Sequence, residues 1–327
     1  MKNVKETTHP ALIRRDNYLR RTWMLYLMLL MPIAFFVVFR YVPMTNIVIA
    51  FRHYNFFRGV WATPNPACTG YPHLPGCNHW VGFHYFQEAF SSPAFWRAVR
   101  NTLMLNFLDL VMGFPAPIIL ALLLNEIAFR RFKKFTQTVV YLPHFLSWII
   151  ISGMAVQLFA PGGGVVNILL GQLGIGPIDF LMTPRNWVTT YIGLGIWKDM
   201  GWGTIIYLAS ITSISPELYE AAEVDGAGRL RKIWSITLPG IRPTIMVLLI
   251  LRLGIILGSE FDRPFAMQNP TVMEVADVLS TYVYRVGIRS GQFSLTAAVG
   301  LFQSIICVAF LVMANALAKK TGERGVW

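Results

Sequence analysis

Charged residues are scarce in this sequence of 327 residues. Only 13% are Asp, Glu, Lys or Arg, whereas 55% are hydrophobic and the mean hydropathy is +0.51. An ordinary soluble domain carries about a quarter charged residues. So little charge, combined with so much apolar side chain, is typical of a protein whose solvent is a lipid bilayer. The composition therefore predicts a membrane protein.

Motifs of catalysis and nucleotide binding are missing as well. The sequence has no G-x-x-x-x-G-K-[ST] loop to hold phosphates, so the chain has no recognisable ATP site of its own. It also has no His-Glu-x-x-His pair, no nucleophile elbow and no convincing pair of catalytic carboxylates. These absences argue against an enzyme, and we expect no cofactor or catalytic metal to be bound by this chain.

Six apolar runs are each long enough to cross a membrane, because a helix rises about 1.5 Å per residue and the hydrocarbon core is about 30 Å thick. The first run follows a polar segment of 21 residues and leads into Arg40-Tyr41-Val42-Pro43, which is no cleavage site. It is therefore predicted to be a retained helix rather than a signal peptide. The six predicted spans cover residues 22–42, 99–126, 138–160, 188–212, 244–262 and 295–318.

Lysine and arginine are distributed unevenly among the segments that join these spans. The net charge of +12 would by itself also suit a nucleic-acid-binding protein, so the position of the charge decides. The alternate segments 1–21, 127–137, 213–243 and 319–327 carry 17 lysines and arginines. The opposite segments 43–98, 161–187 and 263–294 carry 7. Because cytoplasmic loops are the positive ones, both termini are predicted to be cytoplasmic, and nucleic acid is not expected as a partner.

The same division gives the predicted organisation of the chain. A cytoplasmic N-terminal segment, 1–21, precedes the first transmembrane helix, 22–42, and a periplasmic loop, 43–98. Residues 99–318 are predicted to form one transmembrane core of five helices with a cytoplasmic loop at 213–243, and residues 319–327 a cytoplasmic tail. Helix-breaking residues inside the core, such as Pro115, Pro143 and Gly195, have two interpretations that the sequence leaves open: close helix packing, or hinges.

The cytoplasmic loop 213–243 predicts a short helix. Ser215 suits an N-cap and Pro216 the first helical position. Gly226 and Gly228 can end the helix, and a second amphipathic turn is expected to lead to a break at Pro239 before the fifth span. The loop is therefore predicted to present a short helix at the membrane surface.

The composition of this helix favours docking to a protein. Small Ala221 and Ala222 permit close approach of a partner, while Glu220 and Asp225 offer polar anchors. The alternative is a linker lying on lipid headgroups. The several carboxylates of the helix make that less favourable, because the cytoplasmic leaflet is anionic.

Three stretches of this loop resemble the EAA signature of the permease subunits of ABC importers: Glu220-Ala221-Ala222, Asp225-Gly226-Ala227 and Ile236-Thr237-Leu238-Pro239. The resemblance implies an all-α membrane protein with the six-helix type I importer fold. It also implies that the short helix couples this chain to an ATPase subunit. The residues that it assigns to this contact are Glu220, Ala221, Ala222, Asp225, Gly226 and Ala227.

Other stretches resemble the polysaccharide-type carbohydrate permeases, among them the permeases that import alginate, over about residues 20–327. These stretches are Asn125-Glu126-Ile127, the run from Arg131 to Tyr141-Leu142-Pro143-His144, and Ser280 to Gly287. The resemblance implies alternating access for an oligo- or polysaccharide in the bacterial inner membrane. The partners that it implies are a second homologous permease, two ATPase subunits that bind ATP and magnesium, a periplasmic solute-binding protein, membrane lipid and the saccharide.

Ionisable residues inside membrane spans are costly and are candidates for function. Lys198 and Asp199 are adjacent and can neutralise each other, and Glu260 can lie in water at the end of the fifth span, so structural roles remain open. The alternative is a path in which cations face carboxylates and aromatic rings face sugars. The candidate path residues are Trp197, Lys198, Trp202, Tyr207, Arg252 and Glu260.

Two rival classes remain at this point. The charges inside the spans would also suit a carrier or channel driven by an ion gradient, although that class does not explain the docking loop, and the chain shows no inverted repeat. Uptake by this chain alone in liposomes would favour the carrier. A non-transporting membrane scaffold would be favoured if no substrate changed the ATPase activity of the assembled complex.

We predict a disulfide between Cys68 and Cys77, because both lie in the loop assigned to the oxidising periplasm. Closing a ring of about ten residues removes unfolded-state entropy equivalent to roughly 2.5–3 kcal/mol. Cys307 is left as a free thiol in the sixth span. Mass spectrometry of the non-reduced protein checks the bridge: complete alkylation of both cysteines without prior reduction would exclude it.

The competing interpretation of this loop is a zinc site. His73, His79 and His84 lie close in sequence to the two cysteines and would complete a set of four ligands. Their spacing matches no zinc pattern, and an oxidising compartment withdraws thiolate ligands.

Overall fold

The computed structural model describes residues 10–61, 63, 78–258 and 260–320, with side chains from residue 22 onward. Within these residues the chain is helical, and its only β pairing is an isolated bridge between Arg52 and Trp80. It forms two compact units, residues 1–83 and 84–327. Cys68, Cys77 and His73 lie outside the described residues, so the disulfide and the zinc alternative stay predictions.

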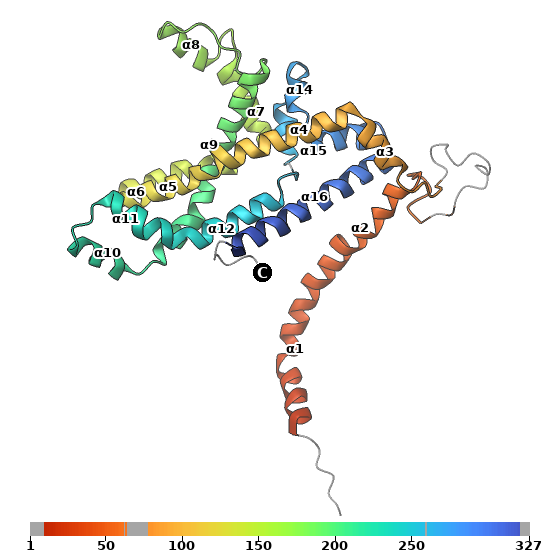
Figure 1. Cartoon of the computed structure of the whole chain (residues 1–327), viewed down its shortest axis with the longest axis horizontal. Helices are drawn as coiled ribbons and strands as arrows, with labels where there is room; N and C mark the ends of the chain where they lie inside the picture. Colours follow the sequence, from red (N-terminus) through yellow and green to blue (C-terminus); the bar gives the residue numbers. More distant parts are fainter. Residues whose placement is uncertain (1–9, 62, 64–77, 259, 321–327) are drawn as a thin grey trace, which may run out of the picture. The chain divides into compact units, whose positions relative to one another are not determined.

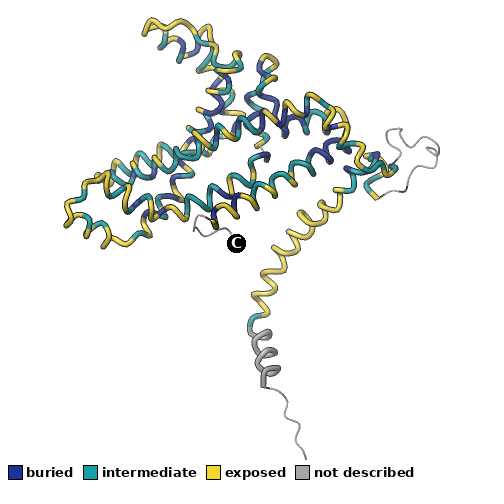
Figure 2. The backbone as a smooth tube through the Cα atoms, in the orientation of Figure 1, coloured by how far each residue is buried: buried dark blue, intermediate teal, exposed yellow. Residues whose placement is uncertain are grey.

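The first unit is a long apolar rod. Helix α1 (Pro10–Phe36) continues through the π-helical turn η1 (Val37–Tyr41) and α2 (Val42–Met44) into the 3-10 turn η2 (Thr45–Phe51) (Figure 1). An 18-residue window within Thr22–Phe51 has a mean hydropathy of 2.2, and most residues of this stretch are exposed (Figure 2). A long, exposed and largely apolar helix of this kind suits a lipid environment. The predicted first span is confirmed as a helix, and it extends to Phe51.

The second unit begins with α3 (His84–Ser91) and a long helix from α4 (Pro93–Leu108) through the π-helical turn η4 (Asp109–Gly113) to α5 (Pro115–Glu126). Then come α6 (Arg130–Tyr141), the 3-10 turn η5 (Leu142–Phe145), α7 (Trp148–Phe159) and α8 (Val165–Gln172). Helix α9 (Pro184–Thr212) runs alongside α5 (Figure 1).

The cytoplasmic loop predicted at 213–243 contains α10 (Pro216–Val224), α11 (Arg229–Lys232) and the π-helical turn η6 (Ile233–Thr237), and leads into α12 (Leu238–Gly254). Short elements follow: α13 (Asp262–Met267), η7 (Pro270–Val272), α14 (Met273–Ala276), α15 (Leu279–Val283) and η8 (Tyr284–Arg289). The last helix, α16 (Phe293–Lys320), packs along α12 (Figure 1).

Within the described residues, four helices are long and apolar enough to cross a membrane, or five if α6 and α7 together form one bent span. Six are not confirmed by this criterion. The four are Thr22–Phe51, Pro93–Glu126, Arg229–Gly254 and Phe293–Lys320. Helix α9 has 29 residues, but it carries Lys198 and Asp199 near its middle and is not one of the four.

The predicted third span, 138–160, is wrong as a single helix. The segments Arg130–Phe145 and Trp148–Phe159 meet at an angle of 102°. Pro143 cannot continue the helical hydrogen bonding. Ser147 then begins a new helix, because its side chain accepts a hydrogen bond from the Ile150 amide at 3.4 Å.

The predicted fifth span, 244–262, is also wrong at both ends, and so is the break expected at Pro239. Pro239 lies in the first turn of α12, where proline is tolerated, and the helical stretch runs from Arg229 to Gly254. The irregular backbone after Gly254 is satisfied by side chains. Asn106 Nδ2 donates to the Ile256 carbonyl at 2.6 Å, and Gln303 Nε2 donates to the Leu257 carbonyl at 2.9 Å.

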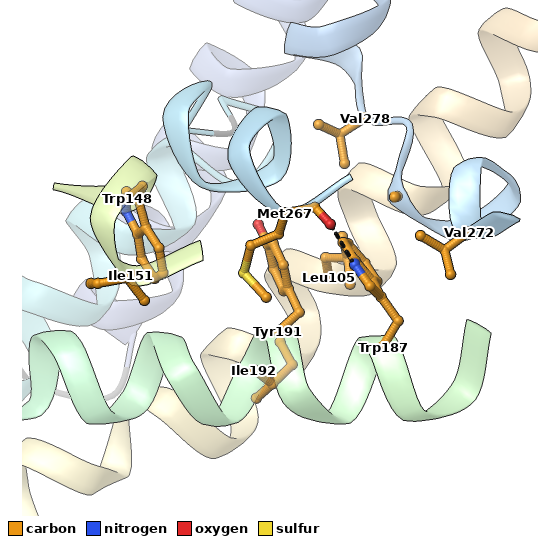
Figure 3. Close-up of a cluster of buried hydrophobic side chains, with 10 residues drawn as sticks. Leu105, Trp148, Ile151, Trp187, Tyr191, Ile192, Met267, Val272 and Val278 are labelled. Carbon is orange, nitrogen blue, oxygen red and sulfur yellow. Dashed lines mark hydrogen bonds between the residues drawn. The ribbon is translucent and has the colours of Figure 1, made fainter. Parts of the chain in front are cut away.

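The largest core cluster lies where α4, α7, α9 and the segment 267–278 meet. Trp187 is fully buried, and its Nε1 donates to the Met267 carbonyl at 2.9 Å (Figure 3). Tyr191 stacks on Trp187 with ring centroids 4.9 Å apart, and Trp148 packs from α7. This cluster fixes α13 against the middle of the helical bundle.

Candidate functional site

A buried ion pair joins two segments far apart in the sequence. Arg263 of α13 and Asp109 at the start of η4 have only 6% and 9% of their side chains exposed. Arg263 Nη1 donates to Asp109 Oδ2 at 2.6 Å, and Nη2 donates to Oδ1 at 3.3 Å and to the Tyr191 carbonyl at 2.6 Å. A bidentate pair with an additional backbone acceptor satisfies most of the charge that burial takes from water.

Helix α9 provides the space into which the Arg263 guanidinium fits. A Cβ atom at Gly195 would overlap the Arg263 guanidinium, so only glycine leaves room for it. Arg263 lies over the Tyr191 ring at 3.8 Å and over the Trp148 ring at 5.2 Å. The close-up in Figure 3 shows these two aromatic side chains in the same core cluster.

Two cavities, of about 380 and 430 Å³, are both lined by this ion pair. The side chains that line both are Asp109, Asp199, Arg252 and Arg263. The first cavity is otherwise largely apolar, with His144, Trp202 and Tyr207 in its wall, and the second adds Asn106, Tyr191 and Glu260. Apolar walls with a few charged groups are typical of a ligand site.

Arg252 is the least satisfied charge in these walls. Its side chain is 47% exposed, and its Nη2 lies 3.8 Å from Asp109 Oδ2, a carboxylate that Arg263 already binds with both nitrogens. The carboxylates opposite have donors of their own. Trp148 Nε1 donates to Glu260 at 3.1 Å, and His144 Nδ1 lies 3.0 Å from Asp199 Oδ1. Arg252 therefore remains available to an anion in either cavity.

Four of the predicted path residues line these cavities: Trp202 and Tyr207 the first, Glu260 the second, and Arg252 both. Trp197 and Lys198 line neither. Lys198 is buried, its Nζ donates to the His144 carbonyl at 2.8 Å, and its charge lies over the Trp148 ring. Lys198 lies one turn before Trp202 on the same side of α9, but its ammonium group is bonded to the His144 carbonyl and does not line the cavity. Trp197 lies on a different side of the helix.

Two residues of the site escaped the sequence analysis. Arg263 was assigned to an outer loop, because the apolar run was taken to end at residue 262. His144 was quoted only as part of a family pattern, yet its ring stacks on Trp202 with centroids 4.6 Å apart and an interplanar angle of 6°. No periodicity points to either residue, since neither lies in a regular transmembrane helix.

The short helix predicted in the loop 213–243 is present. Helix α10 has Ser215 at its N-cap, without a side-chain hydrogen bond, and Pro216 in its first turn. Gly226 follows with φ +74, a left-handed conformation that glycine adopts without strain. Ala221 is exposed, whereas Ala222 packs partly against the chain's own loop, so only one of the two alanines lies open to a partner.

The remaining predicted docking residues lie around the same turn. Glu220 and Asp225 are exposed, and the Ala227 amide donates to the Ala222 carbonyl at 2.8 Å. As for metals, the described part of the chain contains no group of three His, Cys, Asp or Glu side chains placed to hold an ion.

Comparison with known proteins gives a consistent result. Residues 94–323 match the model of the family described as binding-protein-dependent transport system inner membrane component. The polygalacturonan/rhamnogalacturonan transport system permease protein YteP of Bacillus subtilis is 44% identical, over 93% of this chain and 90% of its own. Protein LplB of the same organism is 43% identical, over 97% and 93%.

Two solved structures of ABC transporters are also similar to this chain. A chain from the crystal structure of a bacterial ABC transporter involved in the import of the acidic polysaccharide alginate is 40% identical. It has a TM-score of 0.82, with 94% of this chain and 99% of that chain covered. A second structure, of the alginate transporter in complex with an alginate pentasaccharide-bound periplasmic protein, is 39% identical with the same TM-score, over 95% and 99%.

The geometry predicts that replacing either arginine that contacts Asp109 lowers the free energy of unfolding, but by different amounts. Arg263→Met leaves a buried carboxylate without its bidentate partner, and should lower the free energy of unfolding by about 3–5 kcal/mol. Arg252→Met, the matched control, removes a half-exposed cation and should cost less than about 1 kcal/mol. The double variant Arg263→Met/Asp109→Leu should recover much of the loss. Thermal unfolding in detergent measures all three, and equal costs for the two arginines would contradict the assignment.

Proposed function

This chain belongs to the family of binding-protein-dependent transport system inner membrane components, and we propose that it carries acidic oligosaccharides across the membrane by alternating access. It is a permease subunit of a sugar-importing ABC transporter, a multi-pass protein of the inner membrane and not an enzyme. Membership of this family favours ATP-driven import over a carrier driven by an ion gradient.

The substrate class rests on Arg252. Polygalacturonan and alginate, named for a relative and for the transporter in the solved structures, are both polymers of uronic acids, so each sugar ring carries a carboxylate. The guanidinium of Arg252 is half-exposed and lines both cavities, and the carboxylate of Asp109 beside it is already bound by Arg263. It therefore offers a carboxylate of the sugar a planar, bidentate partner. This single contact supports an acidic rather than a neutral saccharide.

Aromatic side chains complete the proposed path. Trp202 is 48% exposed and lines the first cavity, where its indole stacks on the ring of His144, another residue of the same wall. A flat exposed ring is the surface on which the apolar face of a sugar packs. Tyr207 is buried behind it in the wall, so we assign it to shaping the cavity rather than to contact with sugar.

The proposed assembly follows from the open walls. Both cavities open to the surface of this chain, and we propose that a second, homologous permease closes the path. Two ATPase subunits with ATP and magnesium would dock on the cytoplasmic side, and a solute-binding protein on the outer side. In support, one of the similar structures is a complex with a substrate-loaded periplasmic protein.

We propose that α9 and the bent pair α6–α7 also cross the bilayer, which would give six spans with both termini cytoplasmic. The positive loops support this sidedness. The charged middle of α9 contacts Trp148 and His144 of the same chain, so a helix with modest hydropathy can be accommodated inside a bundle.

Replacing Arg252 should change selectivity. In liposomes with the full complex, Arg252→Gln should lower ATP-driven uptake of an oligogalacturonate or alginate pentasaccharide about tenfold or more, the usual loss for a charged hydrogen bond. Any neutral oligosaccharide that is imported should be affected far less. Lys198→Gln is the control, because Lys198 bonds the His144 carbonyl and not the cavity, so its effect should be equal for both substrates. Equal losses in Arg252→Gln would contradict the proposed substrate class.

If α10 docks on an ATPase subunit, changing it should uncouple ATP hydrolysis from uptake. Gly226→Val forces a β-branched residue into φ +74, and Glu220→Lys reverses an exposed anchor. Both variants should remain membrane-inserted while uptake falls severalfold relative to ATP hydrolysis. Gly228→Ala is the matched control, since its backbone angle is ordinary and a Cβ there meets no neighbouring atom. Normal uptake by both variants would exclude docking through this helix.

A further inference from the structure

One face of α10 is bonded to its own chain. Tyr219 and Glu223 are four residues apart, so they lie on the same side of the helix. The Tyr219 hydroxyl lies 2.9 Å from Thr237 Oγ1, and Lys232 Nζ donates to Glu223 Oε1 at 2.6 Å. Both partners come after the Gly226 turn, and the two contacts therefore hold α10 against the segment that follows it.

Thr237, which receives the contact from Tyr219, is buried. Thr237 is 1% exposed, and its hydroxyl is also within 3.5 Å of the Lys232 carbonyl, the last residue of α11. It ends the π-helical turn η6, directly before α12 begins at Leu238. Helical turns of this kind recur at functional sites, because the extra residue redirects side chains. Here the redirected hydroxyl meets Tyr219.

The opposite face of α10 is left open. Leu218 and Ala221 are exposed, and Val224 is 89% exposed. A solvent-exposed valine and leucine on a short helix are apolar groups that a partner surface can cover. The helix thus has one face for its own chain and one face for another protein.

Helix α12 connects this clamp to the cavities. Its 17 residues, Leu238–Gly254, extend about 25 Å at 1.5 Å per residue, and Arg252 lies at the far end. The base of α12 is packed against α9 through Ile241, Tyr207 and Ile211. The helix is continuous from Leu238 to Gly254 and includes Pro243 near its base.

We propose that the bonds Tyr219–Thr237 and Glu223–Lys232 form a clamp that makes α10 and α12 move as one body, so that displacement of α10 reaches Arg252. The four residues are positioning residues: they bind neither substrate nor nucleotide. The proposal rests on the proposed function, since it describes how the docked helix acts on the cavities.

The ion pair of the clamp persists at neutral pH. The hydrogen bond from Lys232 lowers the pKa of Glu223. A lowered pKa in the folded state means that the contact is fully present above the ordinary glutamate range and is lost only as the pH falls through the lowered value. Lys232 is the one cation bonded to Glu223, and the neighbouring Glu220 forms no ion pair within the described residues.

The test compares two hydroxyl pairs of equal length. Tyr219→Phe and Thr237→Val remove the clamp bond, whereas Ser210→Ala and Thr244→Val remove a 2.9 Å bond that joins α9 to α12 without involving α10. Each variant is reconstituted in liposomes with the complete complex, and uptake of an alginate pentasaccharide is divided by ATP hydrolysed. Amide hydrogen exchange of residues 216–224 is measured on the same complexes.

We expect the clamp variants to lower the uptake-to-hydrolysis ratio two- to tenfold, the range for loss of one hydrogen bond, and to speed exchange in α10 similarly. The control variants should change neither. Glu223→Lys should act like the clamp variants, and adding Lys232→Glu should restore the ratio by reversing both charges.

Two results would overturn the clamp. If exchange in α10 is unchanged, the contacts do not hold the helix. If exchange rises but the ratio stays at the wild-type value, they hold the helix without transmitting its motion. Failure of the proposed function can be distinguished from failure of the clamp. If the proposed function is wrong, the wild-type complex shows no ATP-driven uptake, whereas hydrogen exchange still reports whether the contacts hold α10.

Discussion

The arrangement of the core depends on the buried bond between Asp109 and Arg263. It joins two residues that are 154 positions apart in the sequence. Asp109 lies in the π-helical turn η4 between α4 and α5, and Arg263 lies in the short helix α13. Neither charge is tolerable in this place without the other, because the cost of taking an ion out of water is met only by a close partner. The pair therefore excludes arrangements in which α13 lies away from the long helix α4–α5.

The residues around the ion pair leave space for the guanidinium and bind it. Gly195 removes a side chain where the guanidinium passes, and Tyr191 offers both its carbonyl and its ring. The ion pair lines both cavities and leaves Arg252 sharing an occupied carboxylate. A structural ion pair thus creates the unsatisfied charge on which the proposed selectivity for acidic saccharides rests.

The two functional regions lie at opposite ends of one element. Helix α12 begins beside the bonded face of α10 and ends with Arg252 in the cavity walls. Polar bonds concentrate at these two ends: the hydroxyl pairs Tyr219–Thr237 and Ser210–Thr244 at the base, and the Asn106 and Gln303 bonds to the irregular backbone after the tip. The middle of the helix is apolar, and the helix runs without a break between the proposed docking site and the proposed ligand site.

Hydropathy and capping residues determined much of this from the sequence alone. The apolar first and last spans and the short helix opened by Ser215-Pro216 and closed by Gly226 are local features, since each depends on residues within one or two turns. The ends of the third and fifth spans, the role of Lys198 and the presence of Arg263 in the site were decided only in the tertiary structure. Lys198 and Arg263 are alike in sequence, both cations near apolar runs. Their difference lies in which partners, the His144 carbonyl or Asp109, the packed helices bring within hydrogen-bonding distance, and such partners are distant in the chain.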